Sequence, residues 1–197
     1  MATKEDILEQ IVEEYLVHNG YFVRHNVKFV PRKDHPDFVS NQDSNHSDID
    51  VLRFHPKLEG HARVVAVTCK SWQGGFNINR EISAIQNGKI LRGRDSWKAF
   101  RELTIPKWAE AFVRAIKDAT GSDQFTYVLA VARVTGDRAS WQDHPPFLKA
   151  IGGNPIQIID FQEMIAEIDK KLTRTLASTE VGRMLQMFRA AKLLRTQ

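Results

Sequence analysis

Residues 47–54, SDIDVLRF, and residues 62–72, ARVVAVTCKSW, are two hydrophobic segments joined by the short polar turn HPKLEGH at residues 55–61. Both segments contain β-branched residues, which favour strands. The second is the most hydrophobic segment of the chain, and its valines indicate a central strand covered on both faces. The sequence therefore predicts two neighbouring strands, the second of which ends in a lysine.

Charged residues stand at matched positions of these two strands. Side chains alternate along a strand, so Asp48 and Asp50 share one face, and Thr68 and Lys70 share a face of the next strand. If the strands pair around the turn, Asp50 and Lys70 meet at one end of the sheet. Charges are rarely buried unless they are paired or bind a metal. Carboxylates suit Mg²⁺, and a metal-bound water beside a lysine is a nucleophile suited to phosphodiester cleavage.

The rest of the chain alternates between helical and strand patterns. We expect helices at 4–19, 79–91, 96–103, 106–121, from 161 onward and at 180–194, strands at 21–30, 124–134 and 154–160, and loops at 32–46 and around Pro145-Pro146. Gly121 ends one helix, and Asp160 with Glu163 forms a capping box for another. This order predicts an α/β protein with a mixed sheet flanked by helices. We expect a core at residues 1–160 and a helical extension, packed on it, at 161–197.

The composition indicates which partners and which cellular compartment suit the protein. The net charge of +4 and pI of about 9.2 are compatible with a polyanionic partner. The single cysteine, Cys69, excludes an internal disulfide framework and fits a reducing compartment. Neither a secretory signal pattern nor an apolar run of about 18 residues is present, so we expect a cytoplasmic protein without a membrane partner.

The two strands together resemble the PD-(D/E)xK, or restriction-endonuclease-like, nuclease superfamily. In that family an Asp stands on one strand and a (D/E)-x-K pattern ends the next, as SDIDVL and VTCKSW do here. The local match is similar to the Mrr-like and Holliday-resolvase-like branches. The resemblance covers about two thirds of the chain, since residues 4–134 follow the family's αβββαβ core. It implies a restriction-endonuclease-like mixed central sheet with additional C-terminal helices.

The resemblance also implies roles for individual residues. Asp50 matches the metal-binding Asp, Lys70 matches the lysine that orients or activates the attacking water, and the backbone carbonyl of Cys69 matches a main-chain metal ligand. Many relatives add a glutamate from the first helix. Here that residue is Glu9, a second metal ligand, with Glu13 and Glu14 as alternatives. The implied activity is Mg²⁺-dependent hydrolysis of DNA by an endonuclease, with Mn²⁺ able to substitute.

One position departs from the family pattern. The second carboxylate should stand two residues before the lysine, where this chain has Thr68. Glu81 and Asp48 are the candidates to replace it. The alternative is a degenerate nuclease fold that binds nucleic acid or a protein partner without cutting. A further alternative is that the chain is an unrelated α/β protein, in which Asp48, Asp50 and Lys70 are ordinary solvated residues.

A basic stretch follows the candidate site. It comprises Lys89, Arg92, Arg94, Lys98 and Arg101. Such residues grip phosphates, which dominate affinity for nucleic acids, although solvated helix charges give the same pattern. Trp72 and Gln73, directly after the lysine strand, are further candidates for contact with DNA, Trp72 by stacking on a base. A homodimer is an expectation from the general frequency of symmetric dimers.

Overall fold

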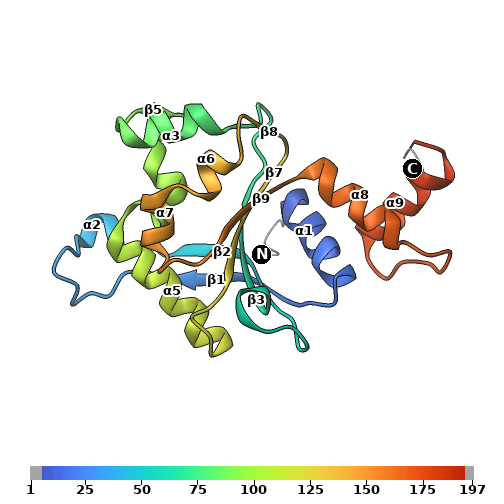
Figure 1. Ribbon diagram of the computed structural model, residues 1–197, viewed down its shortest axis with the longest axis horizontal. Helices are drawn as coiled ribbons and strands as arrows, with labels where there is room; N and C mark the ends of the chain where they lie inside the picture. The colour runs from blue at the N-terminus through green and yellow to red at the C-terminus, as the bar shows by residue number, and fades with distance from the viewer. Residues whose placement is uncertain (1–5, 194–197) are drawn as a thin grey trace.

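A five-stranded mixed sheet lies at the centre of the computed structural model, which describes residues 6–193 (Figure 1). Its strands, in spatial order, are β1 (Phe22–Phe29), β2 (Ser47–Phe54), β3 (Val64–Lys70), β7 (Thr126–Val131) and β9 (Ile156–Asp160). The first three are antiparallel, whereas β3, β7 and β9 are parallel. Every residue of β7 is buried, as expected for a parallel strand covered on both faces.

Helices cover both faces of the sheet and define two hydrophobic cores. The larger core lies under α3 (Ile78–Gln86), α4 (Arg101–Thr104), α5 (Pro106–Thr120), α6 (Ala139–Gln142) and α7 (Pro145–Ala150). The smaller core lies under α1 (Ile7–His18), α8 (Phe161–Lys171) and α9 (Glu180–Ala190). Short elements connect them: α2 (Ser40–Asp43), the 3-10 helices η1 (Gly60–Ala62) and η2 (Ser96–Phe100), and the two-residue strands β4 (Phe76–Asn77), β5 (Ile90–Leu91), β6 (Arg94–Asp95) and β8 (Val134–Thr135).

Several local signals are confirmed. Strand β2 has the predicted bounds, and α5 begins at Pro106 and ends before Gly121, which has a φ of 74°. That left-handed backbone is easiest for glycine, which has no Cβ. The capping box of α8 is present, with Asp160 and Glu163 each accepting a hydrogen bond from the other's backbone N–H.

Other expectations differ from the structure. The loops expected at 32–46 and around Pro145-Pro146 contain the short helices α2 and α7. Helix α7 begins at Pro145, because proline suits the first turn of a helix as well as a loop. The helix expected at 79–91 ends at Gln86, and a β5–β6 hairpin follows. The first helix begins at Ile7 with Asp6 as its cap, and the last ends at Ala190. Residues 4, 5 and 194 of the expected helices lie outside the described residues.

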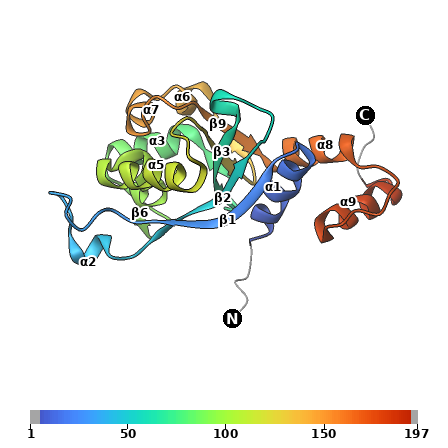
Figure 2. The ribbon, with the colours of Figure 1, turned by 90° about the horizontal axis from the view of Figure 1, so that it is seen from below.

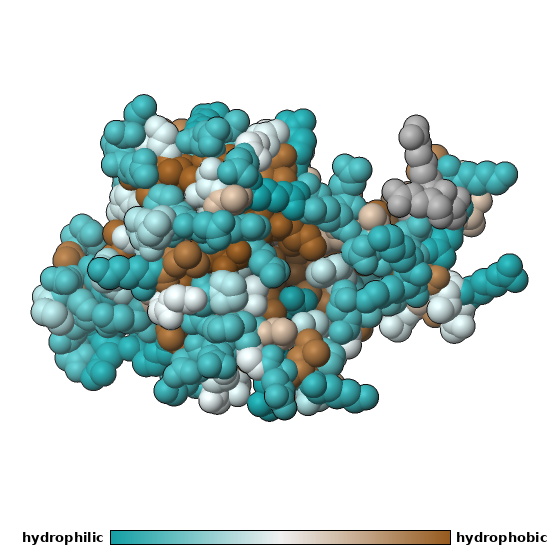
Figure 3. Space-filling model, viewed as in Figure 1, coloured by the Kyte–Doolittle hydropathy of each residue, from teal (hydrophilic) through white to brown (hydrophobic). Residues whose placement is uncertain are grey.

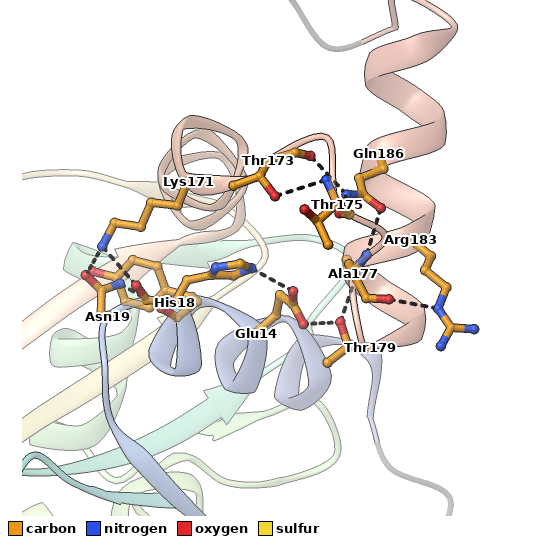
Figure 4. A network of polar contacts seen from close by, with 12 residues as sticks. Glu14, His18, Asn19, Lys171, Thr173, Thr175, Ala177, Thr179, Arg183 and Gln186 are labelled. Carbon is orange, nitrogen blue, oxygen red and sulfur yellow. Dashed lines mark hydrogen bonds and ion pairs between the residues drawn. The ribbon is translucent and has the colours of Figure 1, made fainter.

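The C-terminal helices pack on α1 through a buried carboxylate (Figure 4). Glu14, only 3 % exposed, accepts hydrogen bonds from the hydroxyl of Thr179 and from His18 Nε2. Lys171 bonds to Asn19 Oδ1 at 2.6 Å and to the carbonyl of His18. Polar contacts as well as the smaller core therefore position α8 and α9.

The surface is otherwise mostly polar. In the view of Figure 3 hydrophilic side chains cover most of the molecule, and hydrophobic side chains show through mainly near its middle. Figure 2 shows β1 and β2 running outward together toward α2. Within residues 6–193, no helix combines the length and the apolar character that crossing a bilayer requires.

Candidate active site where strands β2 and β3 diverge

Strands β2 and β3 separate at Asp50. Their last paired residues are Val51 and Val67, and beyond them the Asp50 carboxylate lies between the strands. Its Oδ2 accepts a 2.6 Å hydrogen bond from the backbone N–H of Cys69. The N–H and C=O of one strand residue point to the same side, so the Cys69 carbonyl is directed toward the same gap. A side chain thus replaces the strand ladder at this point.

The regular alternation of strand β2 also breaks at Asp50. Ile49 and Leu52 pack in the larger core, but Val51 between them packs in the smaller one. In a regular strand Ile49 and Val51 would share a face. On the neighbouring strand, Asn26 lies between the partners of Ile49 and Val51 and has a φ of 53°. The strand is therefore irregular next to Asp50, whose carboxylate lies toward β3.

The surroundings of Asp50 favour its neutral form. Burial raises the pKa of the Asp50 carboxyl, and the charge of Lys70 and the Cys69 hydrogen bond lower it by less. The negative charges of Glu102 and Asp48 raise it further. The charges of Lys70 and Glu102 are therefore near enough to act on Asp50. The Asp50 carboxylate is also largely shielded from water, which disfavours its charged form.

Lys70 ends strand β3 beside an aromatic ring. It is half-buried, and its Nζ lies 5.8 Å from the centroid of the Phe100 ring. In the part of the chain that the structure describes, neither Asp50 nor Lys70 forms a direct ion pair. The ammonium group is thus positioned by packing and keeps hydrogen-bond donors for another partner.

Glu102 brings a second carboxylate to this end of the sheet. It belongs to α4, is 5 % exposed, and accepts hydrogen bonds from Tyr127 Oη at 2.8 Å and from Thr68 Oγ1 at 3.4 Å. Thr68 occupies the position of the missing (D/E)-x-K acid, so the carboxylate of Glu102 lies against the residue that replaces that acid. The burial of the Tyr127 hydroxyl and the negative charge of Glu102 raise the pKa of Tyr127.

Sequence reasoning missed Glu102. It lies more than thirty residues after Lys70, in a segment for which the sequence predicts a helix but no functional residue. Its one local signal is its place between the apolar residues Phe100 and Leu103, both buried in the larger core. An acid on the apolar side of a short helix indicates a buried partner, but not which partner.

The other predicted carboxylates lie in different surroundings. Glu9 on α1 lies near Cys69. Burial is the main cause that raises the pKa of the Cys69 thiol, and the negative charges of Asp50 and Glu9 raise it further. Glu13 lies 3.2 Å from His25, while Glu14 helps to dock α9. Asp48 is exposed, and its charge is the smallest of the influences on Asp50.

Glu81 is held in another interaction. It is 1 % exposed, and both of its oxygens accept hydrogen bonds from the Arg92 guanidinium, at 2.8 and 2.6 Å. Arg92 also stacks on Trp72, at 3.4 Å from the ring centroid, and Trp72 contacts Phe76 and Phe100. Glu81 is therefore paired with the cation of a cation–π contact, and no hydrogen bond or ion pair of the described residues joins it to Asp50. The ring of Trp72 is largely covered by these contacts.

The remaining basic residues surround the β5–β6 hairpin. Lys89 and Arg94 are exposed, as is Gln73 after the lysine strand. Lys98 pairs with Asp95 at 2.8 Å and lies over the ring of Trp97. Five of the predicted nucleic-acid contacts are exposed, and two of these five, Arg92 and Lys98, are also paired with carboxylates.

The side chains present fit a Mg²⁺ ion in charge and ligand type. Among residues 6–193, no three His, Cys, Asp or Glu side chains gather as a ready metal cluster. Mg²⁺ keeps several waters, however, and is commonly held by one or two carboxylates. Asp50 and Glu102 supply two, in an environment where their like charges disfavour one another and a divalent cation would relieve the repulsion.

Comparison with known proteins adds no family: no family model, no curated protein and no solved structure matches the chain.

Proposed function

We propose that the protein is a Mg²⁺-dependent nuclease of the restriction-endonuclease-like type that hydrolyses phosphodiester bonds in DNA as an endonuclease. The observation that supports this most is the Asp50 carboxylate held by the Cys69 N–H where β2 and β3 diverge, within electrostatic reach of Lys70 and Glu102. The antiparallel β1–β2–β3 unit followed by a parallel β7 agrees with the core that the sequence resemblance implies.

Each residue has a role that its contacts support. Asp50 Oδ2 is oriented by the Cys69 N–H, which leaves Oδ1 for the metal, and the Cys69 carbonyl faces the same gap. Tyr127 and Thr68 donate hydrogen bonds that orient Glu102, the second acidic ligand. Lys70 Nζ holds the attacking water by hydrogen bonding. When bound, Mg²⁺ supplies Lewis-acid polarisation of the phosphoryl group.

The experiment is cleavage of supercoiled plasmid and of a labelled duplex, with Mg²⁺, with Mn²⁺ and with EDTA. We expect metal-dependent cleavage that Asp50→Asn and Lys70→Met each reduce at least 100-fold, the size of effect typical for groups that stabilise charge in the transition state. Asp123→Asn is the matched control, because Asp123 is an exposed carboxylate paired with Lys117 before the opposite end of β7. Cleavage that both site variants retain at the parental rate rejects the proposal.

A second candidate function is nucleic-acid binding without cleavage. Thr68 in place of the acidic residue favours it, since a threonine hydroxyl is a neutral and weak ligand for Mg²⁺. Salt-dependent DNA binding by a parent protein that is inert with both metals supports this candidate over the nuclease.

A further inference from the structure

A cavity lies beside α4, the helix that carries Glu102. It has a volume of about 590 Å³ and is enclosed by α2, the segment η2–α4 and the start of α5. Its polar lining includes Asn41, Gln42, Lys98 and Arg101, with the aromatic residue Trp97. Cavities of a few hundred Å³ with a few convergent polar groups are typical of ligand sites.

Arg101 is the lining cation that makes no direct ion pair among the described residues. Its guanidinium lies 4.4 Å from the centroid of the Trp108 ring, and within residues 6–193 the side chain makes no hydrogen bond and no ion pair. The two other lining cations are engaged, Lys107 by Asp43 at 2.6 Å and Lys98 by Asp95 at 2.8 Å. The cavity therefore has three cations against two carboxylates, and both carboxylates are already paired.

The geometry around Arg101 suits a phosphate group. The guanidinium lies over the Trp108 ring, and partial burial, which lowers the pKa of Arg101, removes part of its water. A rigid, poorly hydrated guanidinium with free donors binds phosphate through two parallel hydrogen bonds. Phosphate would supply the hydrogen-bond acceptors that this arginine lacks among the described residues.

The other lining residues suit a nucleobase. Trp97 offers an aromatic surface, on which bases stack without regard to sequence. Asn41 and Gln42 are exposed and carry amides that can pair with the edge of a base. Glu102, the next residue after Arg101, points away from the cavity toward Tyr127 and Thr68. Adjacent residues of α4 therefore face different sites: Arg101 lines the cavity, and Glu102 faces the candidate active site.

We propose that this cavity binds one nucleotide of a nucleic-acid strand, next to the position of cleavage, with its phosphate on Arg101 and its base against Trp97. The inference extends the proposed nuclease function, but its test requires no cleavage. Binding of a fluorescent single-stranded oligonucleotide is measured in EDTA at low salt, in competition with a nucleoside, its 5′-monophosphate and inorganic phosphate.

Arg101→Met keeps the stem over Trp108 and removes the charge, whereas Arg101→Lys keeps the charge and removes the planar fork. We expect Arg101→Met to weaken binding at least 10-fold, Arg101→Lys to restore only part of it, and Trp97→Leu to weaken it about 5-fold or more. Arg63→Met is the matched control, because Arg63 also stacks on an aromatic ring, Phe54, but precedes the opposite end of β3. Melting curves verify that each variant is folded.

Three results would overturn the inference: parental affinity in Arg101→Met, an equal loss in Arg63→Met, or a mononucleotide that competes as strongly as the oligonucleotide. The first two remove Arg101 as a specific phosphate ligand, and the third assigns the cavity to a free nucleotide. Because binding is measured without a divalent metal, a protein that binds through Arg101 but never cleaves rejects only the nuclease proposal.

Discussion

The Asp50 carboxylate accepts a 2.6 Å hydrogen bond from the backbone N–H of Cys69, in the place where a strand partner would otherwise stand. This contact ties the end of β3 to β2 after their ladder has stopped. It also holds a carboxylate in a poorly hydrated gap beside Lys70 and Glu102. Burial of this carboxylate has a cost in stability, and this cost can be measured.

Asp50→Asn should therefore stabilise the fold at neutral pH. Burial raises the pKa of Asp50, so the folded state binds more protons than the unfolded state as the pH falls. The cost of the charge is fully present above the folded pKa and disappears below the ordinary value of 3.8. We expect the melting temperature of the variant to exceed the parental value by about 2–4 °C at pH 7, with a smaller difference at pH 4.

The same measurement on Asp48→Asn is the control, because Asp48 is exposed on the same strand. A lower melting temperature for Asp50→Asn at pH 7 would mean that the Cys69 hydrogen bond outweighs the desolvation of the carboxylate.

Glu102 is expected to be required for cleavage. Glu102→Gln retains an oxygen that accepts from Tyr127 but removes the negative charge, so we expect at least a 10-fold loss of Mg²⁺-dependent activity with little change in melting temperature. Thr68→Glu returns an acid to the neighbouring position. In the double variant it should recover part of the loss, measured under single-turnover conditions. Parental activity in Glu102→Gln excludes this residue as a ligand.

Glu81 is expected to contribute to stability rather than to chemistry. Replacing Arg92 by Met leaves a fully buried carboxylate without its cation, which should lower the free energy of unfolding by about 3 kcal/mol. The exposed pair Lys98–Asp95 is the comparison, and Asp95→Asn should cost less than about 1 kcal/mol. Urea denaturation measures both. Equal, small effects would show that the Arg92–Glu81 pair is not held as the structure describes.

Gly182 should be needed for the docking of α9 on α1. A methyl group at this position would lie 2.6 Å from Glu14 Oε1 and 2.7 Å from the Cβ of Ala177, closer than atoms pack. We expect Gly182→Ala to expose the 172–179 connection to limited proteolysis. Gly74→Ala, where a methyl group meets nothing within 4 Å, should leave the digestion pattern unchanged. Resistance of both variants to protease would contradict this packing.

Much of the architecture follows from signals that act over a few residues. The β-branched residues of SDIDVLRF, the valines before Lys70, the proline and glycine around α5, and the capping box of α8 all predict elements that the structure contains. These signals succeed because strand propensity, fixed proline φ angles and helix capping depend on a few neighbouring residues of the chain. The mixed sheet flanked by helices follows from the order of those elements.

Only the tertiary structure decided which charges meet. Glu81 and Glu102 are both acids of helices that follow Lys70, and nothing local separates them. Folding brings Arg92 onto Glu81, and it brings Tyr127 and Thr68 onto Glu102 from strands that are remote in sequence. The sequence by itself predicted that Asp50 and Lys70 lie at the same end of the sheet, because their strands are joined by a short turn. The partner of Thr68 depends on how α4 packs against the sheet, and packing is a property of the whole core rather than of any segment.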